Sequence, residues 1–335
     1  MKSNKALILT SALGGVLLFA SVGCGSKKTV VLDLTPEQKA YATEKGLKES
    51  ELGTILGEPL FELTPRQNET FFQYLQTTEP SLTKRVVTLA RKNIGQPYEL
   101  YLLGEYPFEP YDPQPVVSLD KSDCVVFVEH TYAMSLADDW GSFFRYLQRI
   151  RYKDGAISVL TRNHYTEADW NPNNSWLLTD LSAELAGADT ATYSQTVNRK
   201  NFFDKRYKLS TEIEKQTVEV QYVPLEVMER VAPQLQEGDM VNFVRTKKDG
   251  GKWVGHVGLV GVAPDGRRTI IHSAEPSVRE EDMLKMVERS LDGREERLED
   301  GKQVLVGFKF LRPTADPLAE LRKIDGPDAP KISFP

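Results

Sequence analysis

The order of the predicted secondary structure constrains the fold of this chain more than any other feature. Apolar residues recur at helical spacing in the first half, which predicts helices at 65–75, 81–93, 124–136 and 140–150. From residue 218 the pattern is that of strands, at 218–223, 239–244, 253–262, 269–273 and 303–310. Because helices precede strands rather than alternate with them, the sequence predicts a segregated α+β domain, not a doubly wound sheet.

Composition narrows the class of protein. The 335 residues are 40% hydrophobic and 27% charged, which is typical of a globular protein and not of a multi-span membrane protein. The net charge of −6 and the lack of a basic run argue against a nucleic-acid partner. The two cysteines, Cys24 and Cys124, are too few for a disulfide scaffold, and no CxxC spacing indicates a structural zinc site.

The first residues have the pattern of a secretory signal. Lys2 and Lys5 precede an apolar run over 6–20, and the small residues Ser21, Val22 and Gly23 lead into Cys24. The segment resembles a bacterial lipoprotein signal, which predicts removal of residues 1–23 and lipid attachment to Cys24. An uncleaved membrane anchor is the alternative. Either interpretation predicts an exported protein held in the bacterial cell envelope on the periplasmic side, with the outer membrane as one destination.

Cys124 is the candidate nucleophile. Asp123 can cap a helix that begins at Cys124, and the unpaired amides and dipole of a helix N-terminus lower the pKa of a thiol there. An ionised Asp123 works against this effect, so catalysis requires a nearby histidine. The alternative is a buried structural cysteine.

Two of the four histidines can lie close together. His256 and His272 flank a predicted hairpin with the turn Pro264-Asp265-Gly266. In that register Gly258 opposes His272, and the two rings share one sheet face as diagonal neighbours, roughly 7–8 Å apart at the backbone. This geometry suits a base, His256, that is oriented by a second ring, His272. His130, six residues after Cys124 on one helix, cannot reach the thiol and is predicted to lie on the surface.

These residues belong to a recognisable pattern. Its segments are Asp123-Cys124-Val125-Val126-Phe127-Val128-Glu129, Glu237-Gly238-Asp239, Gly255-His256-Val257-Gly258, Ile271-His272-Ser273-Ala274 and Gly95-Gln96-Pro97-Tyr98. Together they resemble the NlpC/p60 superfamily of papain-like cysteine hydrolases. Ile150-Arg151-Tyr152, the run Arg162 to Tyr165, and Trp170 make the N-acetylmuramoyl-L-alanine amidase-like family the closer resemblance, over about residues 81–312.

The resemblance implies a fold and an activity. The fold is a helical lobe carrying Cys124, packed on an antiparallel sheet or barrel carrying His256 and His272. The activity is hydrolysis of the bond between N-acetylmuramic acid and L-alanine in peptidoglycan or muropeptides, with these three residues as the catalytic triad and no cofactor. Tyr98 is a candidate oxyanion donor, and Arg162 and His164 are candidate substrate-binding residues.

Three alternatives stay open. A stem-peptide endopeptidase would use the same triad, whereas a non-catalytic lipoprotein would only bind wall peptides. A metal site could be built from Cys124, His164, His256 and His272, but no two of them form a close ligand pair on one element. The predicted organisation is a signal at 1–23, a tether and helical segment at 24–80, the hydrolase domain at 81–313 and a proline-rich, weakly ordered tail at 314–335.

Overall fold

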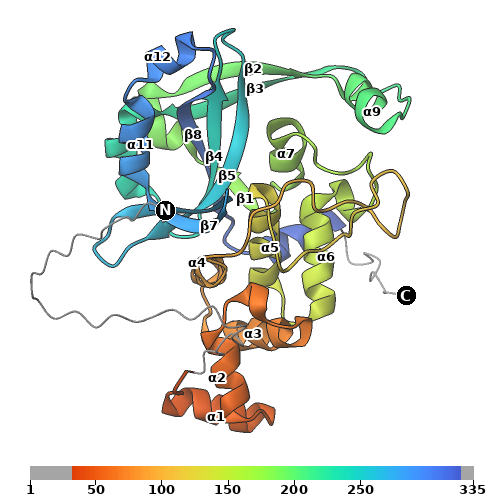
Figure 1. Cartoon of the computed structure of the whole chain (residues 1–335), viewed down its shortest axis with the longest axis vertical. Helices are drawn as coiled ribbons and strands as arrows, with labels where there is room; N and C mark the ends of the chain where they lie inside the picture. Colours follow the sequence, from red (N-terminus) through yellow and green to blue (C-terminus); the bar gives the residue numbers. More distant parts are fainter. Residues whose placement is uncertain (1–31, 326–335) are drawn as a thin grey trace, which may run out of the picture.

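The fold confirms the predicted α+β class. A computed structural model describes residues 32–325 of the chain. The helices of the first half of the chain form a layer on one face of an antiparallel sheet, and helices of its last third pack on the other face (Figure 1). The strands lie in the order β2-β3-β8-β4-β5-β6-β7, and the short β1 pairs with β8. Cys24 and the signal segment lie outside the described residues.

The strands have the following bounds: β1 Leu178–Asp180, β2 Ala191–Val197, β3 Gln216–Pro224, β4 Met240–Thr246, β5 Lys252–Val262, β6 Arg268–Ala274, β7 Ser277–Asp282 and β8 Val304–Pro313. All five predicted strands are present. The sequence analysis missed the short β1 and also β2 and β7, because polar residues make up most of β2 and charged residues most of β7. The omission of β7 matters, since it supplies a residue of the site.

The α-helices have the following bounds: α1 Pro36–Lys45, α2 Glu49–Gly57, α3 Pro65–Thr78, α4 Leu82–Lys92, α5 Cys124–Leu136, α6 Trp140–Arg151, α7 Asn171–Asn173, α8 Ser182–Ala186, α9 Arg199–Tyr207, α10 Met228–Val231, α11 Met283–Leu291, α12 Arg294–Glu299 and α13 Pro317–Asp325. The helix at Cys124 has its predicted bounds. The prediction of a weakly ordered tail is wrong for α13, since Leu321 is buried in the main core. None of the helices described between residues 32 and 325 is long and apolar enough to span a membrane.

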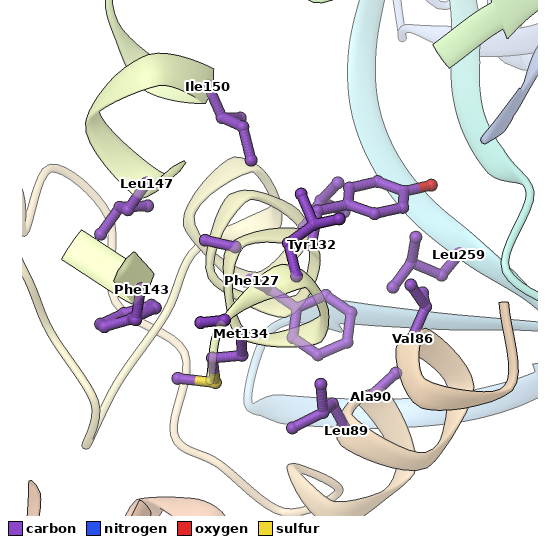
Figure 2. Packing of buried hydrophobic residues seen from close by; sticks show 14 of the residues in the cluster. Val86, Leu89, Ala90, Phe127, Tyr132, Met134, Phe143, Leu147, Ile150 and Leu259 are labelled. Carbon is purple, nitrogen blue, oxygen red and sulfur yellow. The ribbon is translucent and has the colours of Figure 1, made fainter. Parts of the chain in front are cut away.

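Helix α5 is the centre of the helical layer. Every residue from Val126 to Leu136 is buried, as expected for a helix that is apolar on all sides. Figure 2 shows it enclosed by residues of α4, α6 and β5, among them Val86, Leu89, Ala90, Phe143, Leu147, Ile150 and Leu259. The start of α5, and with it the position of Cys124, is therefore held rigidly against the sheet.

The surface position predicted for His130 is wrong. The ring is 4% exposed, its Nδ1 lies 2.8 Å from the Val126 carbonyl, and its Nε2 accepts the Ser118 N–H. Burial lowers the pKa of His130 to about 3, so the ring is neutral and Nδ1 carries the proton that bonds to the carbonyl. The prediction that His130 lies on a different side of the helix from Cys124 rests on the helical angle and stands. The face of α5 that carries His130, which we expected to be exposed, is covered by residues before α5, such as Ser118.

Alternating residues of the central strands bury both faces of the sheet. Met240 and Leu259 pack against the helices, whereas Val241 and Val260 face a second core that α10 and α11 help to form. This period of two is the ordinary geometry of a strand covered on both sides. A polar site can exist here only where the packing opens, which is at the start of α5.

Candidate active site

The start of α5 is inserted where β5 and β6 separate. The two strands pair from Val262–Arg268 to Leu259–Ile271, as the hairpin turn predicted, and the pairing ends there. Beyond that point Ser273 of β6 donates its hydroxyl to the Ser122 carbonyl at 2.9 Å. The Val257 N–H of β5 lies close enough to the Cys124 sulfur to oppose the rise in the pKa of the thiol. Cys124 therefore packs near the residue that follows His256.

The two histidines meet on one face of the sheet, as predicted. His256 Nε2 lies 2.7 Å from His272 Nδ1. Gly258 makes this approach possible, because a Cβ at that position would lie only 3.0 Å from the His272 Cβ. Phe243 packs edge-on against the His256 ring, with the ring centroids 4.8 Å apart, and so limits its rotation.

Glu281 is a further member of this array that the sequence analysis missed. Its Oε1 lies 3.0 Å from His272 Nε2, and Arg279 and Arg289 both form ion pairs with the carboxylate at 2.7 Å. Bonds from these three partners, despite partial burial, lower the pKa of Glu281 to about 2. The signal was weak, because β7 has few apolar residues and Glu281 is one acid among several.

The ionised Glu281 fixes where the protons of the histidines lie. A carboxylate accepts only, so His272 Nε2 carries a proton and its Nδ1 is the acceptor. His256 Nε2 must then be the donor in the contact between the rings. This leaves the Nδ1 of His256 unprotonated and without a partner among the described residues. It is the nitrogen that can take a proton from the thiol.

The Cys124 thiol and the His256 ring are both neutral in the resting protein. Burial, and then the charge of Asp123, raise the pKa of Cys124 to about 12. Nearby backbone N–H groups lower this pKa, but by less. Burial, and then the proximity of His272, lower the pKa of His256 to about 3. The thiol therefore needs a base at the moment of reaction, as a general-base mechanism requires.

Few of the amides in the first turn of α5 are free for a substrate. Asp123 Oδ1 accepts the Val125 and Val126 N–H groups at 3.0 and 2.9 Å. The remaining amide is that of Cys124 itself, which lies close to the sulfur. Tyr98 is a second candidate donor, because its backbone forms a β-bridge with Ser122, two residues before Cys124. Burial, and then the charge of Cys124, raise the pKa of the Tyr98 phenol to about 12. A protonated phenol can donate a hydrogen bond.

A family model described as N-acetylmuramoyl-L-alanine amidase-like matches residues 88–291. The chain belongs to this amidase-like family. The matched region contains Cys124, His256, His272 and Glu281. No curated protein matches the chain.

Solved structures show that other proteins share the fold. A protein from Legionella pneumophila superposes with a TM-score of 0.64 at 18% identity, covering 76% of this chain and 95% of that chain. An N-acetylmuramoyl-L-alanine amidase from Bacteroides uniformis superposes with a TM-score of 0.53 at 22% identity, covering 70% of this chain and 99% of that one. At these identities the similarity establishes the architecture.

Several motif residues of the amidase-like chain support the site rather than line it. Glu129 pairs with Arg151 at 3.0 Å and accepts the Trp170 indole N–H at 2.9 Å, and all three side chains are buried. Asp239 is likewise fully buried and forms two bonds to Arg312. Glu129 and Arg151 fix α5 against α6, and so they position Cys124 indirectly, whereas Asp239 and Arg312 join the start of β4 to β8.

Arg162 belongs to a group of ion pairs. It pairs with Asp112 and Glu105, at 3.0 and 3.2 Å, and so its charge is already balanced. The acids that follow it in the sequence, Glu167 and Asp169, bind Lys309 and Arg199. The geometry favours a structural role for Arg162.

His164 lines a small cavity of about 50 Å³ together with Val125 and Val257, which flank the nucleophile and the base. Its Nε2 lies 2.7 Å from the Val159 carbonyl, and burial lowers its pKa to about 3. A substrate contact by His164 stays a prediction. Within residues 32–325, no group of three or more histidine, cysteine or acidic residues is arranged to hold a metal ion.

Proposed function

We propose that this chain is a cysteine amidase that hydrolyses the bond between N-acetylmuramic acid and L-alanine in peptidoglycan or muropeptides. The observation that carries the proposal is the placement of a thiol at a helix N-terminus, against the strand that bears His256, which is itself bonded to His272. Membership of the amidase-like family and the named Bacteroides uniformis amidase support this bond as the target.

The proposed reaction follows from the proton positions. The Nδ1 of His256 removes the proton of Cys124 as the sulfur attacks the amide carbonyl. The resulting oxyanion is stabilised by the Cys124 N–H and the Tyr98 hydroxyl. The protonated His256 then gives its proton to the leaving nitrogen of L-alanine, and the acyl group remains on sulfur as a thioester. Water, activated by the same ring, releases the muramoyl carboxylate and restores the thiol.

The second histidine and Glu281 assist by orientation and charge. His272 keeps the Nε2 proton of His256 in place, and Glu281 keeps His272 in the matching tautomer. The negative charge of Glu281 also raises the pKa of His256, and so favours its protonated state during the reaction. The arrangement corresponds to a Cys-His-His triad of the papain-like NlpC/p60 kind with a carboxylate behind it.

Defined muropeptides test the proposal. We expect the purified full chain to release the intact stem peptide from muramic acid, detected by mass spectrometry, and Cys124→Ala to release none. Arg66→Met, an exposed change on α3, serves as the matched control and should cleave like the wild type. Cleavage within the stem would establish the endopeptidase alternative, and no turnover by the wild type would leave the binding alternative. Loss of activity with a chelator would indicate a metal site.

We also propose that the mature protein is lipid-anchored through Cys24 on the periplasmic side of the envelope. The pattern of charged, apolar and small residues before Cys24 supports this proposal. In a bacterial host, Cys24→Ala should move the protein from the membrane fraction to the soluble fraction or leave the signal uncut. A Cys24→Ala protein that fractionates and is processed like the wild type would contradict the proposal.

A further inference from the structure

An arginine lies beside the catalytic pair without a counter-ion. Arg245, on β4, faces Trp253 of β5 next to an irregularity in the pairing of the two strands. The irregularity leaves Gly255 without a partner, and the Arg245 side chain lies across it. A Cβ at Gly255 would lie 2.6 Å from the Arg245 Cδ and 3.1 Å from its Nε. The guanidinium group is therefore adjacent to the residue that precedes His256.

The charge of Arg245 reaches both members of the catalytic pair. It contributes to lowering the pKa of His256, and the thiolate form of Cys124 favours the charged form of Arg245. Both effects agree with the geometry, because the Arg245 side chain lies across Gly255, directly before His256. Groups of a substrate bound near His256 would therefore lie within reach of Arg245.

No described residue balances this charge. Arg245 forms no ion pair and no hydrogen bond within residues 32–325, and its Nε is buried without a partner. The acids near the site are engaged elsewhere, since Asp123 binds helix amides and Glu281 binds His272, Arg279 and Arg289. A partly desolvated cation without a partner is costly for the fold unless a ligand uses it.

We propose that Arg245 forms a carboxylate-binding subsite beside Cys124, and that it takes a free carboxylate from the peptide part of the substrate. A guanidinium fork matches a carboxylate in shape and can form two parallel bonds to it. The peptide stem of peptidoglycan supplies such a group on its second residue, one residue beyond the muramoyl amide. The assignment of this ligand rests on the proposed function, whereas the presence of an anion subsite does not.

Alkylation of Cys124 tests the subsite without any assumption about turnover. Iodoacetate and iodoacetamide differ in a carboxylate, and both react with the sulfur. In the full chain, with the Cys124 peptide followed by mass spectrometry, Arg245→Met should lower the ratio of the iodoacetate rate to the iodoacetamide rate roughly tenfold. Arg66→Met should leave the ratio unchanged. An unchanged ratio in Arg245→Met would overturn the subsite.

Folding of the variant is checked separately. Methionine has a similar length and removes the unpaired Nε, so the thermal midpoint of Arg245→Met should stay close to that of the wild type. Should it unfold, Arg245→Lys decides, because lysine keeps the charge but cannot form the fork. Arg245→Lys should retain part of the preference for iodoacetate. If its ratio of the iodoacetate rate to the iodoacetamide rate equals that of a free cysteine peptide, the result counts against the proposal.

A pair of muropeptides identifies the carboxylate. One carries the free carboxylate on the second stem residue and the other carries a carboxamide there. Arg245→Met should lower kcat/KM for the first roughly tenfold, mainly through KM, and change the second little. Equal losses for both would overturn the assignment of this ligand. If the wild type cleaves neither, the proposed function fails, and the alkylation ratio still decides on the subsite.

Discussion

His256 Nε2 and His272 Nδ1 lie 2.7 Å apart, across the point where β5 and β6 separate. The contact is possible because Glu281 holds the far nitrogen of His272, and because Gly258 has no side chain between the strands. Proton transfer at Cys124 thus depends on residues that never touch the sulfur. Five predictions follow from this arrangement and from the packing that supports it.

Replacing Glu281 by glutamine should lower kcat roughly 10- to 100-fold and leave KM nearly unchanged, because the His272 tautomer is no longer fixed. The Glu281 charge raises the pKa of His256, so its loss should move the acid limb of the kcat/KM profile to lower pH. Glu281→Asp should recover part of the rate. Glu288→Gln, an exposed change on α11, is the control, and a Glu281→Gln profile that overlays the wild-type profile would contradict the role.

Replacing Gly258 by alanine should disrupt the histidine pair. The new Cβ would lie 3.0 Å from the His272 Cβ and 3.0 Å from the Ile271 carbonyl, so the two strands must move apart. We expect the free energy of unfolding to fall by about 1–3 kcal/mol. We expect kcat to fall by a larger fraction of its wild-type value than the free energy of unfolding does. Urea denaturation and kinetics measure the two effects. Gly251→Ala at a turn should change neither, and wild-type activity in Gly258→Ala would show that the rings tolerate displacement.

In the wild type, the charge of Asp123 should oppose ionisation of the Cys124 thiol, while its side chain stabilises α5 as the N-cap. Asparagine caps a helix as well as aspartate, but it carries no charge that raises the pKa of the thiol. At a fixed pH near 8, Asp123→Asn should therefore react faster with iodoacetamide at Cys124 than the wild type. Asp123→Ala should in addition lose about 1 kcal/mol of stability with the cap. A slower reaction in Asp123→Asn would mean that hydrogen bonding at the cap outweighs the charge.

Removal of Arg151 should destabilise the fold strongly. Its loss leaves the buried Glu129 carboxylate without its cation, a change that typically costs about 3–5 kcal/mol. The double variant Arg151→Met with Glu129→Gln should recover much of that loss in urea denaturation, because no charge is left unpaired. Arg230→Met removes an exposed ion pair with Asp189 and should cost less than about 1 kcal/mol. Equal stability of the single and double variants would contradict the explanation.

Stability should depend on pH through His130. The folded state holds its pKa at about 3, below the ordinary 6.5, so the unfolded chain binds more protons below pH 6.5. The stabilisation is complete above about pH 6.5 and is lost as the pH falls toward 3, by up to ~1.4 kcal/mol per pH unit. Against His130→Asn, the wild-type free energy of unfolding should fall more steeply with acid. Parallel curves would show that His130 is not a source of the pH dependence.

The local parts of this structure could be predicted from the sequence. Apolar spacing and the Asp123 cap predicted the bounds of α5, and the turn at Pro264-Asp265-Gly266 predicted the register in which β5 and β6 pair as far as Leu259 and Ile271. These features depend on residues within one turn of helix or one hairpin, where backbone geometry determines which side chains are neighbours.

Tertiary structure alone decided the partners of the charged and polar groups. Glu281 behind His272, the unpaired Arg245, the ion pairs of Arg162 and the burial of His130 all involve segments that are remote or irregular in sequence. Whether such a group is buried, paired or free depends on which distant element covers it, and no local periodicity contains that information. The sequence by itself thus determined the helix that begins at Cys124 and the hairpin that carries the two rings, and the packing of the chain decided how these elements meet and what surrounds them.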